Sequence, residues 1–218
     1  VPMTLTVLGM AGEEVLTRWM VPVITLQTIA ANLGSMLTPI GNPQNLYLYG
    51  LAGISAGRFV LLMLPYTVAS AALLVICVIV CMKGKNRQLE IRLSGSDIQV
   101  NRKLVGIYSI LFVLSLLTVA RIVPYWVTFA VVLVVVLICQ RRLLLKVDYS
   151  LIFTFVGFFV FIGNMGRIEG FRTFVESVLG GHEMITSVLA SQVISNVPAA
   201  VLLSGFTDKY TDLIVGTN

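Results

Sequence analysis

Two short polar stretches interrupt long apolar runs of this sequence, and they hold the side chains best suited to binding ions. The first is residues 34–45, which contain Thr38, Gly41, Asn42 and Asn45. The second is residues 195–198, with the sequence Ser-Asn-Val-Pro. An asparagine amide offers both a donor and an acceptor, so it can bind an anion or a cation without bringing a charge into apolar surroundings. The chemistry we expect here is ion binding.

A second pattern, Gly-Ile-Ser-Ala-Gly at residues 53–57, matches the nucleophile elbow of serine hydrolases. That elbow requires a preceding strand, a following helix and a catalytic histidine. The preceding segment reads as an apolar helix, and the chain's single histidine, His182, is far away in a polar stretch. Spacing for close helix packing is the better interpretation of the two glycines. We therefore predict no catalytic residue, no enzymatic activity and no cofactor.

The composition identifies the medium that surrounds these stretches. Hydrophobic residues make up 57% of the 218-residue chain and charged residues only 11%, whereas soluble domains carry about 25% charged residues. Residues 59–82 are apolar throughout. At about 1.5 Å per residue, they are long enough to cross a hydrocarbon core of about 30 Å. The chain is therefore predicted to be an integral membrane protein.

The net charge of +5 does not indicate a nucleic-acid partner, because the basic residues lie in loops between apolar spans. Such loops usually report topology, since cytoplasmic loops carry an excess of Lys and Arg. With residues 83–103 and 141–146 in the cytoplasm and 167–183 outside, ten of the fifteen cations are cytoplasmic and five are external.

The three cysteines, Cys77, Cys81 and Cys139, all lie in apolar runs. We expect them to be small core residues rather than members of a disulfide or a metal site.

The polar stretches must be positioned by helices that do not cross the membrane continuously. Residues 20–32 are too short to span alone, so we expect one crossing that is broken in mid-membrane at 34–45 and completed by 46–54. Residues 195–198 lie at the centre of the apolar segment 185–206, which favours a re-entrant hairpin. An ordinary turn outside the membrane is the alternative for each stretch. Polar backbone at membrane depth is tolerated where it is buried in protein or lines a wet cavity.

A faint repeat relates the two halves: residues 29–34 resemble residues 214–218. The expected fold class is an all-α polytopic membrane bundle with inverted repeats, broken helices and a re-entrant hairpin. The chain starts inside an apolar run and stops early in another, so we expect a fragment truncated at both ends. The predicted organisation is residues 1–83 as the end of a first repeat (broken helix 19–56, span 58–82), 84–103 as a cytoplasmic linker, and 104–218 as a second repeat (spans 104–120, 123–140 and 149–165, hairpin 185–206, start of a second broken helix 212–218).

The two motifs, Ala-Asn-Leu-Gly-Ser at 31–35 through Gly-Asn-Pro-Gln-Asn at 41–45 and Ser-Asn-Val-Pro-Ala-Ala at 195–200, resemble those of the ion transporter superfamily. The chain is most similar to its citrate-transporter-like permeases, which are related to arsenite permeases, sodium/proton antiporters and divalent anion/sodium symporters. The resemblance implies two inverted repeats, hairpin tips that bind a coupling cation and substrate, and commonly a dimer. The substrate- and ion-binding residues that it implies are Asn32, Thr38, Gly41, Asn42, Asn45, Ser195, Asn196, Pro198, Thr217 and Asn218.

The function that we expect is secondary active transport of a small anion, a carboxylate or an inorganic oxyanion, coupled to a cation. No acidic residue lies deep in a predicted span, which favours a hard cation such as sodium over a proton, held near Ser195, Asn196 and Asn218. An antiporter or efflux permease of the same superfamily is one alternative, and an ion channel is another. The expected partners are the anion, sodium or a proton, the lipid bilayer and a second copy of the chain. The expected location is the cytoplasmic membrane of a prokaryote.

Overall fold

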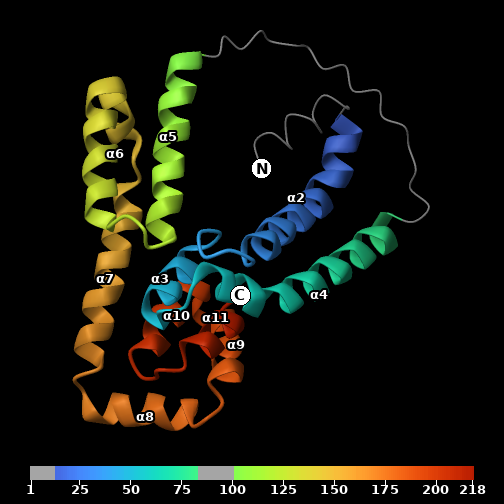
Figure 1. The fold of residues 1–218 in the computed structure, drawn as a ribbon. Coiled ribbons are helices and arrows are strands. Elements are labelled where there is room, and N and C mark those ends of the chain that lie inside the picture. The colour runs from blue at the N-terminus through green and yellow to red at the C-terminus, as the bar shows by residue number, and fades with distance from the viewer. Residues whose placement is uncertain (1–12, 83–100) are drawn as a thin grey trace.

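The computed structural model describes residues 13–82 and 101–218. The apolar start of the chain and residues 83–100, which include most of the predicted linker 84–103, lie outside the described residues. Every regular element in the described ranges is a helix (Figure 1). The elements are α2 (Glu13–Ser35), α3 (Pro43–Ala52), α4 (Ala56–Met82), α5 (Arg102–Val119), α6 (Tyr125–Gln140), the 3-10 helix η1 (Arg141–Lys146), α7 (Tyr149–Met165), α8 (Glu169–Leu179), α9 (Glu183–Ile194), α10 (Asn196–Ser204) and α11 (Tyr210–Gly216).

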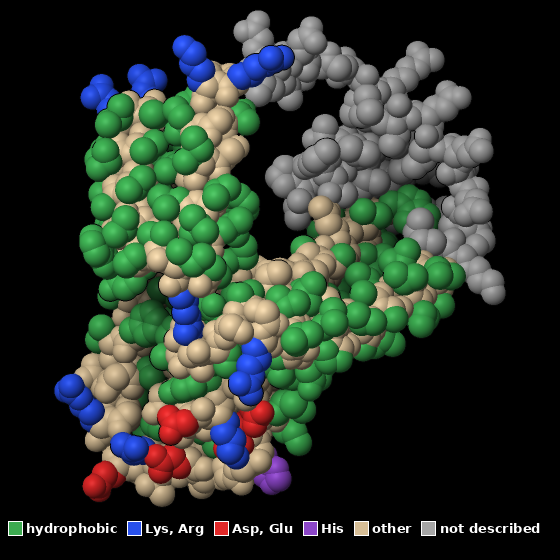
Figure 2. Space-filling model, in the orientation of Figure 1, with side chains coloured by type: hydrophobic (Ala, Val, Ile, Leu, Met, Phe, Trp, Pro, Cys, Tyr) green, Lys and Arg blue, Asp and Glu red, His purple; other side chains and the backbone are tan. Residues whose placement is uncertain are grey.

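Three segments of the described chain are long and apolar enough to cross a membrane: Ala56–Cys81, Arg102–Val119 and Tyr125–Lys146. Helices α7 and α8 pass the same test together but bend by 99° where they meet. The outer surfaces of α4, α5 and α6 are apolar, as Figure 2 shows, with Ile110 and Ile138 exposed by 70% and 79%. Such surfaces are stable only in contact with lipid or other apolar partners. The prediction of an all-α polytopic membrane bundle is confirmed.

The three cysteines correct one expectation. Cys77, Cys81 and Cys139 are free, but all three are exposed rather than buried in a core. They lie on α4 and α6, whose apolar side chains face outward along most of their length. A small apolar residue in a membrane helix need not face protein, because lipid solvates it as well.

Helix α8 was not predicted, since residues 167–183 were interpreted only as a polar external stretch. Its buried residues, Val175 and Leu179, are four positions apart and therefore lie on one face. Phe171 continues this face and packs edge-on against Phe206, with ring centroids 5.8 Å apart. The stretch is thus an amphipathic helix that covers the end of α10.

The core lies where the short helices meet, as Figure 1 shows around the C-terminus. Helices α10 and α11 both pack against α3 and α9. Leu48 of α3, Phe59 and Met63 of α4, and Leu213 and Ile214 of α11 are completely buried there. Residues from the two ends of the sequence therefore share one core, and this core fixes the elements that carry the candidate ion-binding residues.

Candidate functional site

The first polar stretch interrupts a helix, as predicted, although the interruption is shorter than residues 34–45. Helix α2 continues to Ser35 and α3 starts at Pro43. A proline is well suited to the first position of a helix, because its missing N–H would have no partner there. The Asn45 side chain stabilises the interruption by donating to the carbonyl oxygens of Met36 and Thr38, at 3.2 and 3.3 Å.

Gly41 is required by this geometry. A Cβ atom at position 41 would overlap the carbonyl oxygen of Ser35. The Ser35 hydroxyl in turn donates to Asn42 Oδ1 at 2.7 Å. The end of α2 and the start of α3 are therefore held together by contacts that only a glycine at position 41 permits.

The second polar stretch joins two packed helices, α9 and α10. The predicted tip was residues 195–198, but only Ser195 lies outside the helices, with φ +75° and ψ 157°. Asn196 and Pro198 belong to the first turn of α10. A positive φ is unfavourable for serine, and the packing of α9 on α10 holds it in this conformation.

Asn218 joins the two halves of the sequence. Its Oδ1 accepts from Asn42 Nδ2 at 3.1 Å and from Gln44 Nε2 at 3.4 Å. Its Nδ2 donates to Asn45 Oδ1 at 2.6 Å and to the Ile214 carbonyl at 2.7 Å. The amide groups that follow α2 and α11 thus form one hydrogen-bonded network.

An open pocket of about 1010 Å³ lies where these elements meet. Five of the predicted site residues line it: Asn32, Asn42, Ser195, Asn196 and Asn218. The other five do not. Thr38 and Gly41 shape the interruption after α2, while Asn45 and the Thr217 side chain are completely buried behind the pocket. Pro198 continues the first turn of α10.

The pocket also contains polar residues that were not predicted as site residues. Gln44 follows Pro43 in the first turn of α3, and Ser191 and Gln192 come from the last turn of α9. Their sequence signal was weak, because a polar residue in a short apolar helix becomes informative only when the face it occupies is known.

The pocket is polar and has no formal charge, since no Asp, Glu, Lys, Arg or His lines it. Helix ends supply its electrostatic field. The N-termini of α3 and α10 are at the pocket, as are the C-termini of α2, α9 and α11. Helix N-termini present N–H donors and positive dipole ends, and C-termini present carbonyl oxygens. The arrangement can therefore interact with an anion and with a cation at neighbouring positions.

No cluster of His, Cys, Asp or Glu in the described ranges is suited to a metal ion. A cation at the pocket would rely on amide, hydroxyl and carbonyl oxygens, the ligands suited to hard cations. Ser195, Asn196 and Asn218, near which sodium was predicted, all line the pocket. Sodium binding itself stays a prediction.

Charged residues lie away from the pocket, at the other ends of these short helices. Glu183, the first residue of α9, accepts from Lys209 Nζ at 3.0 Å. This hydrogen bond holds the pKa of the Glu183 carboxyl below its usual value. The neighbouring His182 is exposed.

The Gly-Ile-Ser-Ala-Gly segment links α3 to α4, and Ser55 Oγ accepts from the Arg58 backbone N–H in the first turn of α4. The element before this segment is the helix α3, whereas a hydrolase elbow requires a strand there.

The fold and the pocket define a polytopic membrane protein with a neutral polar site between interrupted helices. Residues 1–208 match the citrate transporter family, and the chain belongs to this family. It is 31% identical over 195 residues to an uncharacterized transporter, MJ0456, of Methanocaldococcus jannaschii. It is 28% identical over 198 residues to the inner membrane protein YbiR of Escherichia coli. Each alignment covers 89% of this chain and 52% of the relative, so the chain spans about half the length of these relatives. No solved structure matches.

Proposed function

We propose that the protein is a secondary active transporter that moves a small anion, a carboxylate or an inorganic oxyanion, by alternating access. The observation that carries this proposal is the pocket between the interruption after α2, the α9–α10 hairpin and the end of α11. Membrane transporters bind substrates at sites formed by discontinuous helices. Because the pocket is lined by both halves of the sequence, a movement of one half against the other would open or close it.

The anion would be bound by N–H donors. Helices α3 and α10 direct their first turns to the pocket, and the amide groups of Asn42 and Asn196 lie there as well. A helix N-terminus carries about half a positive elementary charge. Two such ends can attract a carboxylate without a buried lysine or arginine, whose desolvation would be costly.

The coupling cation would be bound by oxygen atoms. Residues at the C-termini of α2, α9 and α11 line the pocket, together with Ser195 and Asn218, and helix C-termini present carbonyl oxygens. Oxygen ligands of this kind suit a hard monovalent cation, and sodium is the cation we propose. Symport then follows from the two bound charges stabilising each other.

The two halves of the chain are proposed to be inverted repeats, with residues 1–83 and 104–218 joined by a cytoplasmic linker at 84–103. The support is that the two similar segments, 29–34 and 214–218, both reach the pocket through Asn32 and Asn218. A homodimer and the cytoplasmic membrane of a prokaryote are the proposed assembly and location. The printed name of the Escherichia coli relative places that relative in the inner membrane.

The decisive experiment is reconstitution of the intact protein in liposomes with radiolabelled citrate, succinate, sulfate and arsenite, with and without a sodium gradient. Saturable uptake of one of these anions that accelerates with inward sodium supports the proposal. Exchange of the anion, or expulsion of arsenite, would instead favour an antiporter or efflux permease. Conduction that neither saturates nor depends on a second ion would favour a channel.

A further inference from the structure

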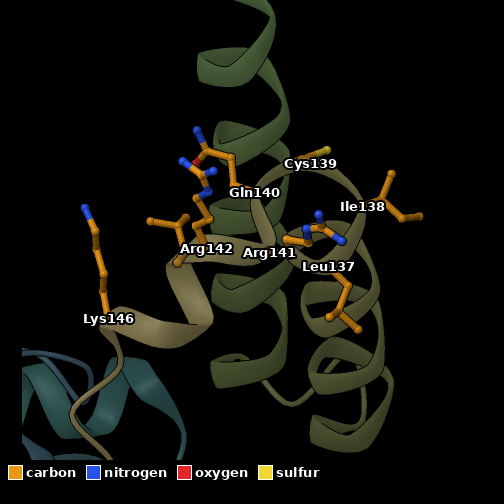
Figure 3. Close-up of a pocket in the computed structure, with 8 residues that line it drawn as sticks. Leu137, Ile138, Cys139, Gln140, Arg141, Arg142 and Lys146 are labelled. Atoms are coloured by element: carbon orange, nitrogen blue, oxygen red, sulfur yellow. The ribbon is translucent and has the colours of Figure 1, made fainter.

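A second pocket, of about 690 Å³, lies where α6 passes into η1 (Figure 3). It is lined by Leu137, Ile138, Cys139, Gln140, Arg141, Arg142, Leu143 and Lys146. In Figure 3 the polar ends of Gln140, Arg142 and Lys146 project to one side of the η1 ribbon. The pocket therefore combines three cationic side chains, one amide and apolar neighbours, and the proposed transport site includes none of these residues.

The charge of this second pocket is strongly positive. Three cations line it and no carboxylate does. The two ion pairs found within residues 13–82 and 101–218 are Arg172–Glu176 and Lys209–Glu183, and neither involves the pocket. Asp148, the nearest acidic residue in the sequence, accepts from the Leu151 backbone N–H. The carbonyl end of α6 contributes about half a negative charge, which leaves a net charge of roughly +2.5.

Gln140 is oriented to donate. Its Oε1 accepts from the Tyr108 hydroxyl at 2.7 Å, which ties α6 to α5. The Nε2 group of the same amide is thereby left to donate to a ligand. An amide donor beside two guanidinium groups and an ammonium suits an oxyanion, and guanidinium groups bind phosphate in a bidentate manner.

The position of the pocket indicates where the oxyanion comes from. It lies at the end of the candidate membrane span Tyr125–Lys146. Leu137 and Ile138, 48% and 79% exposed, continue the lining down the outer surface of α6, and Leu145 is 85% exposed. Long basic side chains at the end of a span place their charges at the level of the lipid headgroups. A ligand with a phosphate and an acyl chain would fill both parts of the surface.

We propose that this pocket binds the phosphate of an anionic phospholipid of the surrounding bilayer, with the lipid's acyl chain lying along α6. The phosphate contacts Arg142, Lys146 and the Gln140 amide, and Arg141 adds positive charge to the same lining. The proposal is independent of the transported substrate, because the lipid occupies the end of the α5–α6 pair that carries Arg141 and Arg142, and none of these residues lines the proposed transport site.

The test measures binding rather than transport, so its failure is distinguishable from failure of the proposed function. The intact protein is placed in nanodiscs of phosphatidylcholine with increasing fractions of phosphatidylglycerol. Retained lipid is counted by native mass spectrometry, and thermal unfolding is followed in parallel. We expect the wild type to retain phosphatidylglycerol and to gain thermal stability with it. The double variant Arg141→Gln/Arg142→Gln should bind phosphatidylglycerol on the order of 30-fold more weakly, since each charge near the surface contributes about a fivefold factor.

Two controls make the result specific. Arg58→Gln/Arg167→Gln removes the same charge from exposed positions outside the pocket and should retain the wild-type response. Arg141→Lys/Arg142→Lys keeps the charge and should bind far better than the glutamine variant, which separates loss of binding from misfolding. Equal weakening by both glutamine variants, or no preference for phosphatidylglycerol in the wild type, overturns the proposal. Inorganic phosphate that reproduces the stabilisation in phosphatidylcholine nanodiscs would assign the pocket to a dissolved anion and would overturn the lipid source.

Discussion

Asn42 and Asn196 reach one pocket from opposite halves of the sequence, but their surroundings differ. Asn42 accepts from Ser35 and donates to Asn218, so it also holds the interruption after α2 in place. No hydrogen bond in the described residues engages the Asn196 side chain, which is at the first position of α10. Replacement of Asn196 is therefore expected to change ligand binding with little effect on the folded structure.

Replacing Asn196 with alanine should raise the Michaelis constant for the anion or the coupling cation, with near-normal thermal stability. One lost contact costs on the order of 1–3 kcal/mol, or roughly 5- to 150-fold in affinity. Asp at this position should be worse for an anion, because it adds repulsion in a site of low dielectric. Asn42→Ala should raise the same constant and also lower stability. Transport kinetics and thermal unfolding of the intact protein measure both effects.

The matched control is Asn164→Ala, which removes an amide that donates to the Val160 carbonyl on the exposed side of α7. It should leave the Michaelis constant unchanged. If the asparagines only cap the backbone at the helix interruptions, the Asn196 and Asn42 variants would lose stability and keep their wild-type constants. That result would contradict a binding role.

Gly216 is a second residue whose type matters, because it allows α11 to pack closely on α9. A Cβ atom there would overlap the Ser187 hydroxyl and the Met184 carbonyl of α9. We expect Gly216→Ala to force α11 away from α9 and to lower the free energy of unfolding by about 1–3 kcal/mol, despite the better helix propensity of alanine. Gly34→Ala is the control, because a Cβ there meets open space. Thermal unfolding in lipid compares them, and equal stability of the two variants would contradict this close contact.

At the scale of elements, contacts between Arg121, Val119 and Tyr49 join the α5–α6 pair to α3. Arg121 lies in the turn after α5, and its guanidinium donates to the Tyr49 carbonyl oxygen at 2.9 Å. The same group lies over the Tyr49 ring, 4.8 Å from its centroid, and the Tyr49 hydroxyl donates to the Val119 carbonyl at 2.9 Å. These contacts hold the C-terminal turn of α3, whose N-terminal turn lines the pocket.

Arg121→Ala should destabilise the protein by about 1–2 kcal/mol, because a charged hydrogen bond and a cation–π contact are lost from a partly exposed site. Arg121 has φ +63°, and alanine would meet the same backbone strain, so the comparison isolates the side chain. Arg58→Ala, at an exposed cation of α4, should have little effect. Thermal unfolding of the two variants gives the comparison. Equal losses of stability in both would show that the Arg121 side chain does not hold α3 in position.

Most of the helices and both interruptions could be predicted from the sequence, because prolines, glycines and polar residues separate its long apolar runs. Pro43 and Gly41 mark the first interruption, although it covers only residues 36–42, because α2 continues to Ser35 and α3 starts at Pro43. Helix α8 was missed, since its buried face consists of only a few apolar residues in a polar stretch. The positions of Gln44 and Ser191 in the pocket and the contact of Arg121 with Tyr49 were also missed, because they depend on which helix faces meet.

At the scale of the whole molecule, the contacts bring together segments that the predicted topology assigns to one side of the membrane. Arg121 contacts the end of α3, Phe206 packs on α8, and Lys209 pairs with Glu183. In the predicted topology each of these pairs lies on the external side. Arg102 and Lys103 begin α5, and Arg141 and Arg142 follow α6, so the antiparallel α5–α6 pair gathers these cations at one end, as Figure 2 shows.

Topology is tested by a thiol at position 92 in the predicted cytoplasmic linker. In a protein without its native cysteines, Arg92→Cys should react with an impermeant maleimide only after the membrane is permeabilised. Thr173→Cys, at an exposed position of α8, should react in intact cells. Labelling of the Arg92→Cys protein from outside would refute the proposed orientation.

The central proposal is that the pocket between the interrupted helices is where the transported anion binds, and substrate protection tests it most directly. Val197 lines the pocket beside Asn196. In a protein whose native cysteines are replaced, Val197→Cys supplies a thiol in the pocket and Thr173→Cys supplies a control thiol on α8. Alkylation rates are measured in proteoliposomes with and without the anion that the transport screen identifies and its coupling cation. We predict that the anion slows alkylation at position 197, over the concentration range that saturates transport, and leaves position 173 unaffected. Continued saturable transport with an unchanged alkylation rate at position 197 would contradict this location of the site.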